Sequence, residues 1–184
     1  MHVPENVRID SASGAIAPES ERYEKRLSEL RQVFADKDAV DRMVGAGDPV
    51  VYKVLAYRKE GSDLWFGTTI IEPGDVGGEC FMTRGHFHKR RDMGEVYYTQ
   101  SGKGVLVLQS RDGRVEVLDM VPGTCSFIPP DWAHRSVNVG PEPLVFVWVC
   151  DTEAGNDYGE ILEKGMAKRV LSGASGPRII DNRT

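Results

Sequence analysis

The sequence lacks the features that mark membrane-spanning, secreted and nucleic-acid-binding proteins. No apolar run approaches the roughly 20 residues that a helix needs to span a bilayer. The first residues, Met1 to Asn6, have neither the basic nor the apolar region of a signal peptide. The formal net charge is −5 and the pI is about 5.4, which argues against a surface for nucleic acid or anionic lipid.

Cysteine is scarce, and its three positions form no motif. Cys80, Cys125 and Cys150 are an odd number at unrelated spacings, and no CxxC occurs. The pattern therefore predicts neither a disulfide framework nor a zinc knuckle. We expect three small buried thiols in a reducing, cytoplasmic protein.

Length and turn spacing predict one all-β domain. The 184 residues are 40% apolar and 28% charged, which is ordinary for a globular domain. We predict a single domain over 1–184, with a core at about 48–151, an N-terminal arm at 1–47 and a C-terminal extension at 152–184. Turn signals such as Ser101-Gly102-Lys103-Gly104 recur every eight to twelve residues or so, which is typical of an antiparallel barrel or jelly roll. The strand-like segments are 50–57, 64–71, 79–83, 95–99, 104–109, 115–118, 124–128, 135–139, 144–149 and 168–171.

Helical signals are confined to the two ends of the chain. Leu27, Leu30 and Phe34 have helical spacing within the charged segment 19–34, which we interpret as a helix. Asp36 is a candidate N-cap of a second short helix that runs through Val44 and ends at Gly45. A further helical turn is expected after Asp157.

The most informative stretch holds two of the four histidines. His86 and His88 are two apart, so a strand would direct both side chains to one face. Glu95 follows after six residues, and His134 lies beyond the next hairpin. Three imidazoles and one carboxylate can hold one divalent transition metal ion and leave positions open. The alternative without a metal is that this polar stretch is simply the solvent-exposed face of a strand.

The two blocks around these residues resemble the motifs of the cupin superfamily. Gly102, Gly123, Pro129 and Asn138 stand at the cupin intervals, although Asp131 occupies a position where glycine is usual. The long gap between His88 and Glu95 resembles that of the cupin-type, metal-dependent glucose-6-phosphate isomerases. That resemblance covers about residues 20–171. It also includes Asp48-Pro49-Val50-Val51-Tyr52, Pro129-Pro130-x-Trp132-Ala133-His134-Arg135 and Ala154-Gly155-x-Asp157-Tyr158-Gly159.

The resemblance implies a cupin double-stranded β-helix (a jelly-roll barrel) with an N-terminal arm, one or two short helices and a homodimeric assembly. It implies that glucose 6-phosphate and fructose 6-phosphate are interconverted with one divalent ion per chain. Iron is favoured, and Mn, Ni or Zn would also suit these ligands. The implied metal ligands are His86, His88, Glu95 and His134, the implied catalytic residues are Glu95 and Tyr97, and the implied phosphate-binding residues are Tyr52, Thr69, Thr83, Gly85 and Tyr158.

Two positions differ from the related isomerases, and the reaction class stays open at this point. Cys150 stands where they carry a tyrosine after the last barrel strand, and Asn156 stands where they carry a histidine. The alternatives are a cupin acting on another sugar phosphate, a cupin dioxygenase with the same ligand shell, and a non-catalytic sugar-sensing module. Proton transfer by Glu95 and a direct hydride shift are both compatible with the residues.

Overall fold

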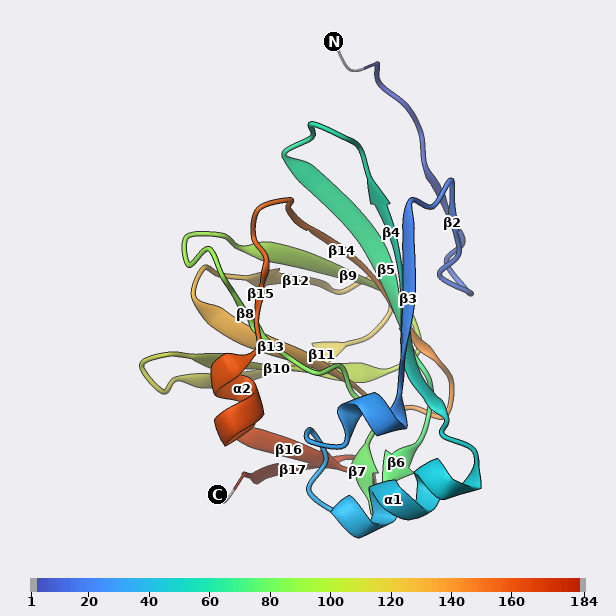
Figure 1. The fold of residues 1–184 in the computed structure, drawn as a ribbon, viewed down its shortest axis with the longest axis vertical. Helices are drawn as coiled ribbons and strands as arrows, with labels where there is room; N and C mark the ends of the chain where they lie inside the picture. Colours follow the sequence, from blue (N-terminus) through green and yellow to red (C-terminus); the bar gives the residue numbers. More distant parts are fainter. Residues whose placement is uncertain (1–2, 183–184) are drawn as a thin grey trace.

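The computed structural model describes residues 3–182, and in it the chain is mostly β-strand (Figure 1). The two α-helices of this range are α1 (Lys37–Ala46) and α2 (Gly159–Lys164), and a 3-10 helix, η1 (Leu27–Leu30), precedes them. None of these helices has the length and apolarity needed to cross a membrane. The strands are β1 (Arg8–Ile9), β2 (Ile16–Ala17), β3 (Glu21–Arg26), β4 (Val50–Arg58), β5 (Leu64–Ile71), β6 (Asp75–Val76), β7 (Glu79–Cys80), β8 (Phe87–His88), β9 (Glu95–Ser101), β10 (Gly104–Ser110), β11 (Val115–Met120), β12 (Cys125–Ile128), β13 (Trp132–Asn138), β14 (Leu144–Asp151), β15 (Asn156–Asp157), β16 (Lys168–Leu171) and β17 (Arg178–Asp181).

Two sheets make up the body of the fold. One has six strands in the order β12-β9-β14-β5-β4-β3, and the other has the order β11-β10-β13. The segment before β8 extends the second sheet, because Met82 bridges Val137 and His86 bridges His134. Strand β15 then pairs with β8 (Figure 1).

One hydrophobic core joins the two sheets. It contains Phe146 from β14, Ile128 from β12 and Leu106 from β10, each at most 1% exposed. Alternate residues of β14 supply this core, as expected for antiparallel sheets packed face to face, whereas β10 is buried along most of its length. The all-β, cupin-type jelly-roll prediction with two short helices is confirmed.

The N-terminal arm covers part of the outer face of the six-stranded sheet. Its β1–β2 hairpin places Ile16 against Leu55, Ile70 and Val145, a small cluster separate from the main core. The Thr68 hydroxyl donates to the Gly14 carbonyl oxygen and fastens the hairpin to β5. The sequence had suggested a loosely held arm or an edge strand for this segment.

The helix expected over 19–34 is wrong. Residues 21–26 form β3, which pairs with β4 at the edge of the sheet, and η1 begins only at Leu27. The charged side chains of β3 are solvated because an edge strand leaves one side open to water. Leu27, Leu30 and Phe34, which have the helical spacing, all lie after β3, so they gave no helical signal for residues 21–26. Pairing with β4 selects the strand there.

The remaining sequence expectations differ from the structure in smaller ways. The Asp36 carboxylate caps α1 as predicted, accepting from the Ala39 N–H at 2.8 Å. The helix ends two residues later than predicted, at Gly47, which adopts a positive φ of 151°. The strand expected over 79–83 is limited to β7, and β17 was missed. Cys80 and Cys150 are buried, whereas Cys125 is exposed on β12, contrary to expectation.

We predict that Gly67→Ala destabilises the fold. A Cβ atom at Gly67 would overlap the Trp148 indole and the Leu55 carbonyl oxygen, and neither backbone nor ring can move freely there. Overpacking of this kind costs about 1–3 kcal/mol, measurable as a lower midpoint in urea unfolding. In the matched control, Gly45→Ala on α1, the new methyl meets no atom within 4 Å. Because alanine is the better helix former, this control should stabilise by up to about 1 kcal/mol. Equal midpoints for the two variants would contradict the prediction.

Candidate metal centre and substrate cavity

Three strands and one bridging segment bring four predicted metal ligands together. His86 lies in the segment before β8, His88 in β8, Glu95 at the start of β9 and His134 in β13. Backbone hydrogen bonds of 3.3 and 3.1 Å link His86 and His134 directly. One ligand atom from each of the four side chains lies within 4.8 Å of every other. Only these strand pairings show that Glu95 and His134 lie next to the HxH pair, because both are distant from it in the sequence.

The imidazole nitrogens that face the centre are free to bind a cation. His88 Nδ1 lies 3.1 Å from the Met93 carbonyl oxygen, and His134 Nδ1 lies 3.3 Å from that of Trp132. A carbonyl oxygen can only accept a hydrogen bond, here from Nδ1–H, so these contacts favour the tautomer in which Nε2 carries a lone pair. His88 Nε2 and His134 Nε2 then face Glu95 Oε2 at 3.3 and 3.1 Å.

His134 Nε2 carries the strongest sign of a missing cation. It is buried and forms no hydrogen bond of acceptable geometry within residues 3–182, although Glu95 Oε2 is near. Two lone pairs directed at each other in a buried site are unfavourable unless a positive charge lies between them. Three imidazole nitrogens and a carboxylate oxygen fit a divalent transition metal ion.

Electrostatics favour the protonation states that a metal site needs. Burial lowers the pKa of His86 well below its ordinary value, and the neighbouring His134 lowers it further. Burial alone would raise the pKa of Glu95, but the neighbouring imidazoles of His134 and His88 lower it to about 2. The carboxylate is therefore ionised and His86 is neutral, as ligation requires. For His88, the contacts with Glu95 outweigh burial and raise its pKa.

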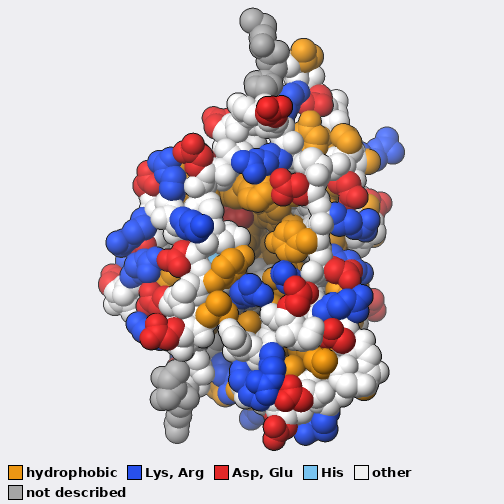
Figure 2. Space-filling view, viewed as in Figure 1, with side chains coloured by type: hydrophobic (Ala, Val, Ile, Leu, Met, Phe, Trp, Pro, Cys, Tyr) orange, Lys and Arg blue, Asp and Glu red, His pale blue; other side chains and the backbone are white. Residues whose placement is uncertain are grey.

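These residues lie in a cavity that opens on one face of the molecule. Figure 2 shows the hollow with apolar side chains on its walls and charged side chains near its rim. All ten residues predicted from the sequence for metal, catalysis or phosphate line this cavity: Tyr52, Thr69, Thr83, Gly85, His86, His88, Glu95, Tyr97, His134 and Tyr158. The structure thus places them together, while their individual roles remain predictions.

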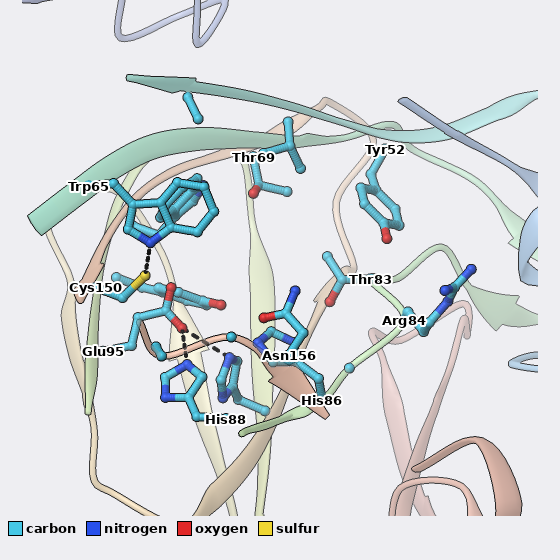
Figure 3. A pocket seen from close by; sticks show the side chains of 18 of the residues that line it. Tyr52, Trp65, Thr69, Thr83, Arg84, His86, His88, Glu95, Cys150 and Asn156 are labelled. Atoms are coloured by element: carbon cyan, nitrogen blue, oxygen red, sulfur yellow. Dashed lines mark hydrogen bonds and ion pairs between the residues drawn. The ribbon is translucent and has the colours of Figure 1, made fainter. Parts of the chain in front are cut away.

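The cavity has two chemically different ends. Figure 3 shows His88 and Glu95 on one side, and Tyr52, Thr83 and Arg84 on the other. The second side offers hydroxyl groups from strands β4 and β5 and from the segment that precedes β8. Gly85 adopts a φ of +78° there, a conformation that favours glycine because it has no Cβ.

Tyr97 lies between the metal cluster and the aromatic wall. It is inward-facing on β9 two residues after Glu95, and its ring centroid is 5.7 Å from that of His134 and 4.7 Å from that of Phe146. Burial, together with the negative charge of Glu95, raises the pKa of Tyr97 well above its ordinary value. The hydroxyl therefore stays protonated and can serve as a hydrogen-bond donor at neutral pH.

The two unusual positions both face the cavity. Cys150 lies within β14, not after it, and is paired in register with Glu95. Its sulfur accepts a hydrogen bond from Trp65 Nε1 (Figure 3). Asn156 lies opposite His88 in the β15–β8 pair and donates to the Tyr158 hydroxyl at 2.9 Å.

Sequence reasoning missed Arg84 and Trp65 as cavity residues. Arg84 stands between two predicted phosphate-binding positions, Thr83 and Gly85, so its place in the chain was an available signal. Trp65 had no such signal, because its orientation depends on the pairing of β5 with β14. Tyr23 was hidden by the mistaken helix over 19–34.

We predict that the protein binds about one divalent transition metal ion per chain and that His88→Ala or His134→Ala abolishes this binding. Loss of an imidazole ligand from a four-ligand shell removes direct coordination, which outer partners cannot replace. Titration calorimetry of the metal-free protein with Mn²⁺ or Zn²⁺ measures the effect. His2→Ala is the matched control, since His2 is the fourth histidine and lies outside the described residues. Stoichiometric binding by His134→Ala with unchanged affinity would contradict the assignment.

The family model and the similar proteins found by comparison have the same description. A family model described as glucose-6-phosphate isomerase (GPI) matches residues 24–183. The chain is 44% identical over 181 residues to a glucose-6-phosphate isomerase of Thermococcus gammatolerans, covering 97% of this chain and 95% of that protein. A protein of the same name from Pyrococcus horikoshii is 42% identical with the same coverage.

A solved oxalate decarboxylase of Lactobacillus farciminis is more distant. It is 20% identical with a TM-score of 0.49, covering 58% of this chain and 30% of that chain. A similarity at this level says nothing about the reaction. The family-model match and the close relatives, by contrast, extend over nearly the whole sequence: the chain belongs to the glucose-6-phosphate isomerase family.

Proposed function

We propose that this chain interconverts glucose 6-phosphate and fructose 6-phosphate, using a divalent transition metal ion held by His86, His88, Glu95 and His134. The observation that carries the proposal is this buried cluster at one end of a cavity whose other end is lined by hydroxyl groups. Membership of the family supports the reaction, and the orphaned His134 Nε2 supports the ion. By resemblance the ion is iron, with Mn, Ni or Zn as substitutes.

The interconversion moves hydrogen between two adjacent carbons and a proton between their oxygens. An ion bound by the four residues would supply Lewis-acid stabilisation of the negative charge that develops on those oxygens. Trp65, Phe146 and Trp148 line the cavity, and their apolar side chains lower the polarity of its walls. In less polar surroundings such stabilisation is stronger than in water.

Glu95 and Tyr97 are the residues placed to handle protons. In a proton-transfer route Glu95 takes the proton from one carbon and returns it to the next. Its low pKa makes Glu95 a weak base as long as its carboxylate keeps all its contacts. To act as the base, the carboxylate has to give up one of these contacts. Tyr97 would donate a hydrogen bond to a sugar oxygen. A direct hydride shift between the carbons needs no base, and the Glu95 variants distinguish the two routes.

The opposite end of the cavity would hold the phosphate. Tyr52, Thr69, Thr83 and Tyr158 offer hydroxyl groups, and Gly85 offers a backbone N–H. Thr69 is 5% and Tyr52 is 6% exposed, so their hydroxyls are preorganised rather than mobile. Anion binding by several neutral donors is common where the backbone approaches closely.

The assay that tests the proposal is anaerobic isomerisation with defined metals. The stripped protein is reloaded separately with Fe²⁺, Mn²⁺, Ni²⁺ and Zn²⁺, and glucose 6-phosphate formed from fructose 6-phosphate is measured. We expect activity only with metal, and a loss of at least about 100-fold in His88→Ala, the scale on which disturbed metal sites fail. Because Glu95 is also a proposed ligand, Glu95→Gln is compared at a metal content matched to the wild type, and there it should keep substantial activity only if hydride shifts directly.

Failure with every metal despite stoichiometric binding would overturn the proposal. Cys150 and Asn156 would then mark a changed substrate, to be sought among other sugar phosphates. Consumption of O₂ would indicate a dioxygenase. Ligand binding without turnover would indicate a sensing module.

We also propose that the chain forms a homodimer through the outer face of its six-stranded sheet. The register places Phe127, Val96 and Val149 side by side on that face, across β12, β9 and β14. Phe127 is 65% and Val149 is 37% exposed. The N-terminal arm covers only the other half of this face, so the apolar row is left to a partner, and symmetric pairs are the commonest assemblies.

We expect Phe127→Glu to yield a monomer with unchanged circular dichroism, because a buried unpaired carboxylate in an interface is costly. Sedimentation velocity measures the change in mass. Ile179→Glu on β17 makes the same substitution at an exposed apolar site (43%) outside this row and should remain a dimer. A Phe127→Glu protein that sediments as the wild type does would exclude this face.

The predicted single-domain organisation, with a core over 48–151, and the cytoplasmic location are retained as parts of the proposal.

A further inference from the structure

We propose that Arg84 binds the phosphate group of the substrate and makes the cavity prefer phosphorylated sugars to neutral ones. The inference rests on the proposed function and adds to it a positive charge at the phosphate end. The predicted set of hydroxyls and one backbone N–H carries no charge, whereas the phosphate of a sugar phosphate carries close to two negative charges at neutral pH.

The first observation is an unpaired buried charge. Arg84 and Arg135 are the arginines of residues 3–182 that are not exposed and yet form no ion pair; the third non-exposed arginine, Arg169, pairs with Glu79. In a chain of net charge −5, carboxylates are abundant, so the absence of an ion-pair partner at both of these arginines is informative. Unpaired buried charges destabilise a fold and persist where a ligand pairs with them.

The second observation is the orientation of the Arg84 side chain. Arg84 lines the cavity on the side of Tyr52 and Thr83 (Figure 3). Its guanidinium lies over the Tyr158 ring, with Cζ 5.2 Å from the centroid, and Nη2 donates to the Glu29 carbonyl oxygen at 3.1 Å. These two contacts fix the plane of the group. Nε is buried without a partner, and no other hydrogen bond to the guanidinium forms in the described part of the chain.

The carboxylate of Glu29 does not neutralise this charge. Its oxygens bind Lys25 Nζ at 2.7 Å and the Arg26 N–H at 3.0 Å, and these two bonds are the main causes that lower the pKa of Glu29. Arg84 contributes only a weaker, longer-range lowering of that pKa. The guanidinium therefore keeps its positive charge without an ion pair, and N–H groups that the Glu29 carbonyl oxygen does not engage remain to donate charge-assisted hydrogen bonds to a phosphate.

Arg135 acts as a positioning residue behind Arg84. It is 4% exposed and does not line the cavity. Its Nε and Nη2 both donate to the Arg84 carbonyl oxygen, at 3.2 and 2.6 Å. A Cβ atom at Gly85 would lie 3.1 Å from Arg135 Nε, so the turn at Gly85 and the buried guanidinium fit each other closely. Burial lowers the pKa of Arg135 to about 10, which leaves it charged at neutral pH.

The position of Arg84 in the chain suits a sugar phosphate. Only Gly85 separates it from His86, so their Cα atoms are at most about 7 Å apart. The Arg84 side chain extends away from the metal cluster (Figure 3). A phosphate held at Arg84 places the opposite end of an open-chain sugar at His86 and its partners. One short segment, Thr83 to His88, therefore spans the substrate from phosphate to reacting carbons.

The test compares Arg84→Met, Arg84→Lys and Arg42→Met in the metal-loaded full chain. Methionine keeps an unbranched side chain against Tyr158 but removes the charge, and lysine restores the charge without the fork. Arg42 is exposed on α1, so its replacement is the matched control for net charge. For Arg84→Met we expect KM for fructose 6-phosphate to rise about 10- to 100-fold, the value of a charge-assisted hydrogen bond. We expect kcat to change much less, Arg84→Lys to be intermediate and Arg42→Met to match the wild type.

A second readout is independent of activity. Inorganic phosphate is titrated into each metal-free variant, and the fluorescence of the two cavity tryptophans, Trp65 and Trp148, reports binding. Wild-type affinity should fall as the pH drops through about 6, where phosphate loses its second charge. In Arg84→Met the affinity should be weaker by a similar factor to the KM change, and this fall should be smaller.

The outcomes separate this inference from the proposed function. An active wild type, with KM and phosphate affinity unchanged in Arg84→Met, would overturn the role of Arg84 and leave the isomerase intact. An inactive wild type would refute the isomerase, and the phosphate titration would still decide whether Arg84 binds the anion. A selective loss of phosphate affinity in Arg84→Met, with a folded protein by circular dichroism and partial rescue by lysine, would establish the inference.

Discussion

The backbone pairing of His86 with His134 is the contact on which the rest of the site depends. Its two hydrogen bonds attach the segment before β8 to β13, and the Met82–Val137 bridge attaches the same segment four residues earlier. Because the segment is held at both points, its side chains have fixed directions. The pairing sets His86 and His134 in ring contact, with centroids 4.4 Å apart, and places Arg135 beneath Gly85. The histidine cluster and the Thr83–Gly85 side of the cavity thus lie on one pair of neighbouring segments.

This arrangement places stability and function in opposition. An ionised carboxylate, three imidazoles and two guanidinium groups without ion pairs are costly to remove from water when no ligand is bound. The surrounding sheets offset that cost by packing a continuous apolar core, with Phe146, Ile128 and Leu106 nearly or fully inaccessible to solvent. A metal ion and a phosphate each supply the charge that the empty cavity lacks. The same groups that weaken the free protein are therefore the ones that a sugar phosphate and its ion would satisfy.

The departures from the usual cupin pattern have structural explanations. Asp131 occupies a glycine position and adopts a φ of +63°, which aspartate tolerates better than most residues. Its carboxylate accepts hydrogen bonds from Arg91 and Arg111, and Arg111 also pairs with Asp157 and Glu160. An ion-pair network thus connects the β12–β13 turn to the segment that carries Asn156 and Tyr158. Asp131 adds a support that a glycine could not provide.

Much of this protein was determined by local sequence, and the remainder by contacts between distant segments. Turn residues and alternating apolar residues were sufficient to predict most of the strands and the all-β class, because both signals are local. The HxH pair and the resemblance to a known family were sufficient to predict which residues cluster with the histidines and line the cavity, whereas the roles of these residues stay predictions. The strand β3 could not be predicted, since the hydrogen bonds that select strand over helix at residues 21–26 come from β4. The same limit hid Trp65, Tyr23 and the unpaired charge of Arg84: whether a side chain faces a cavity, and whether a charge finds a partner, is decided only when distant strands meet.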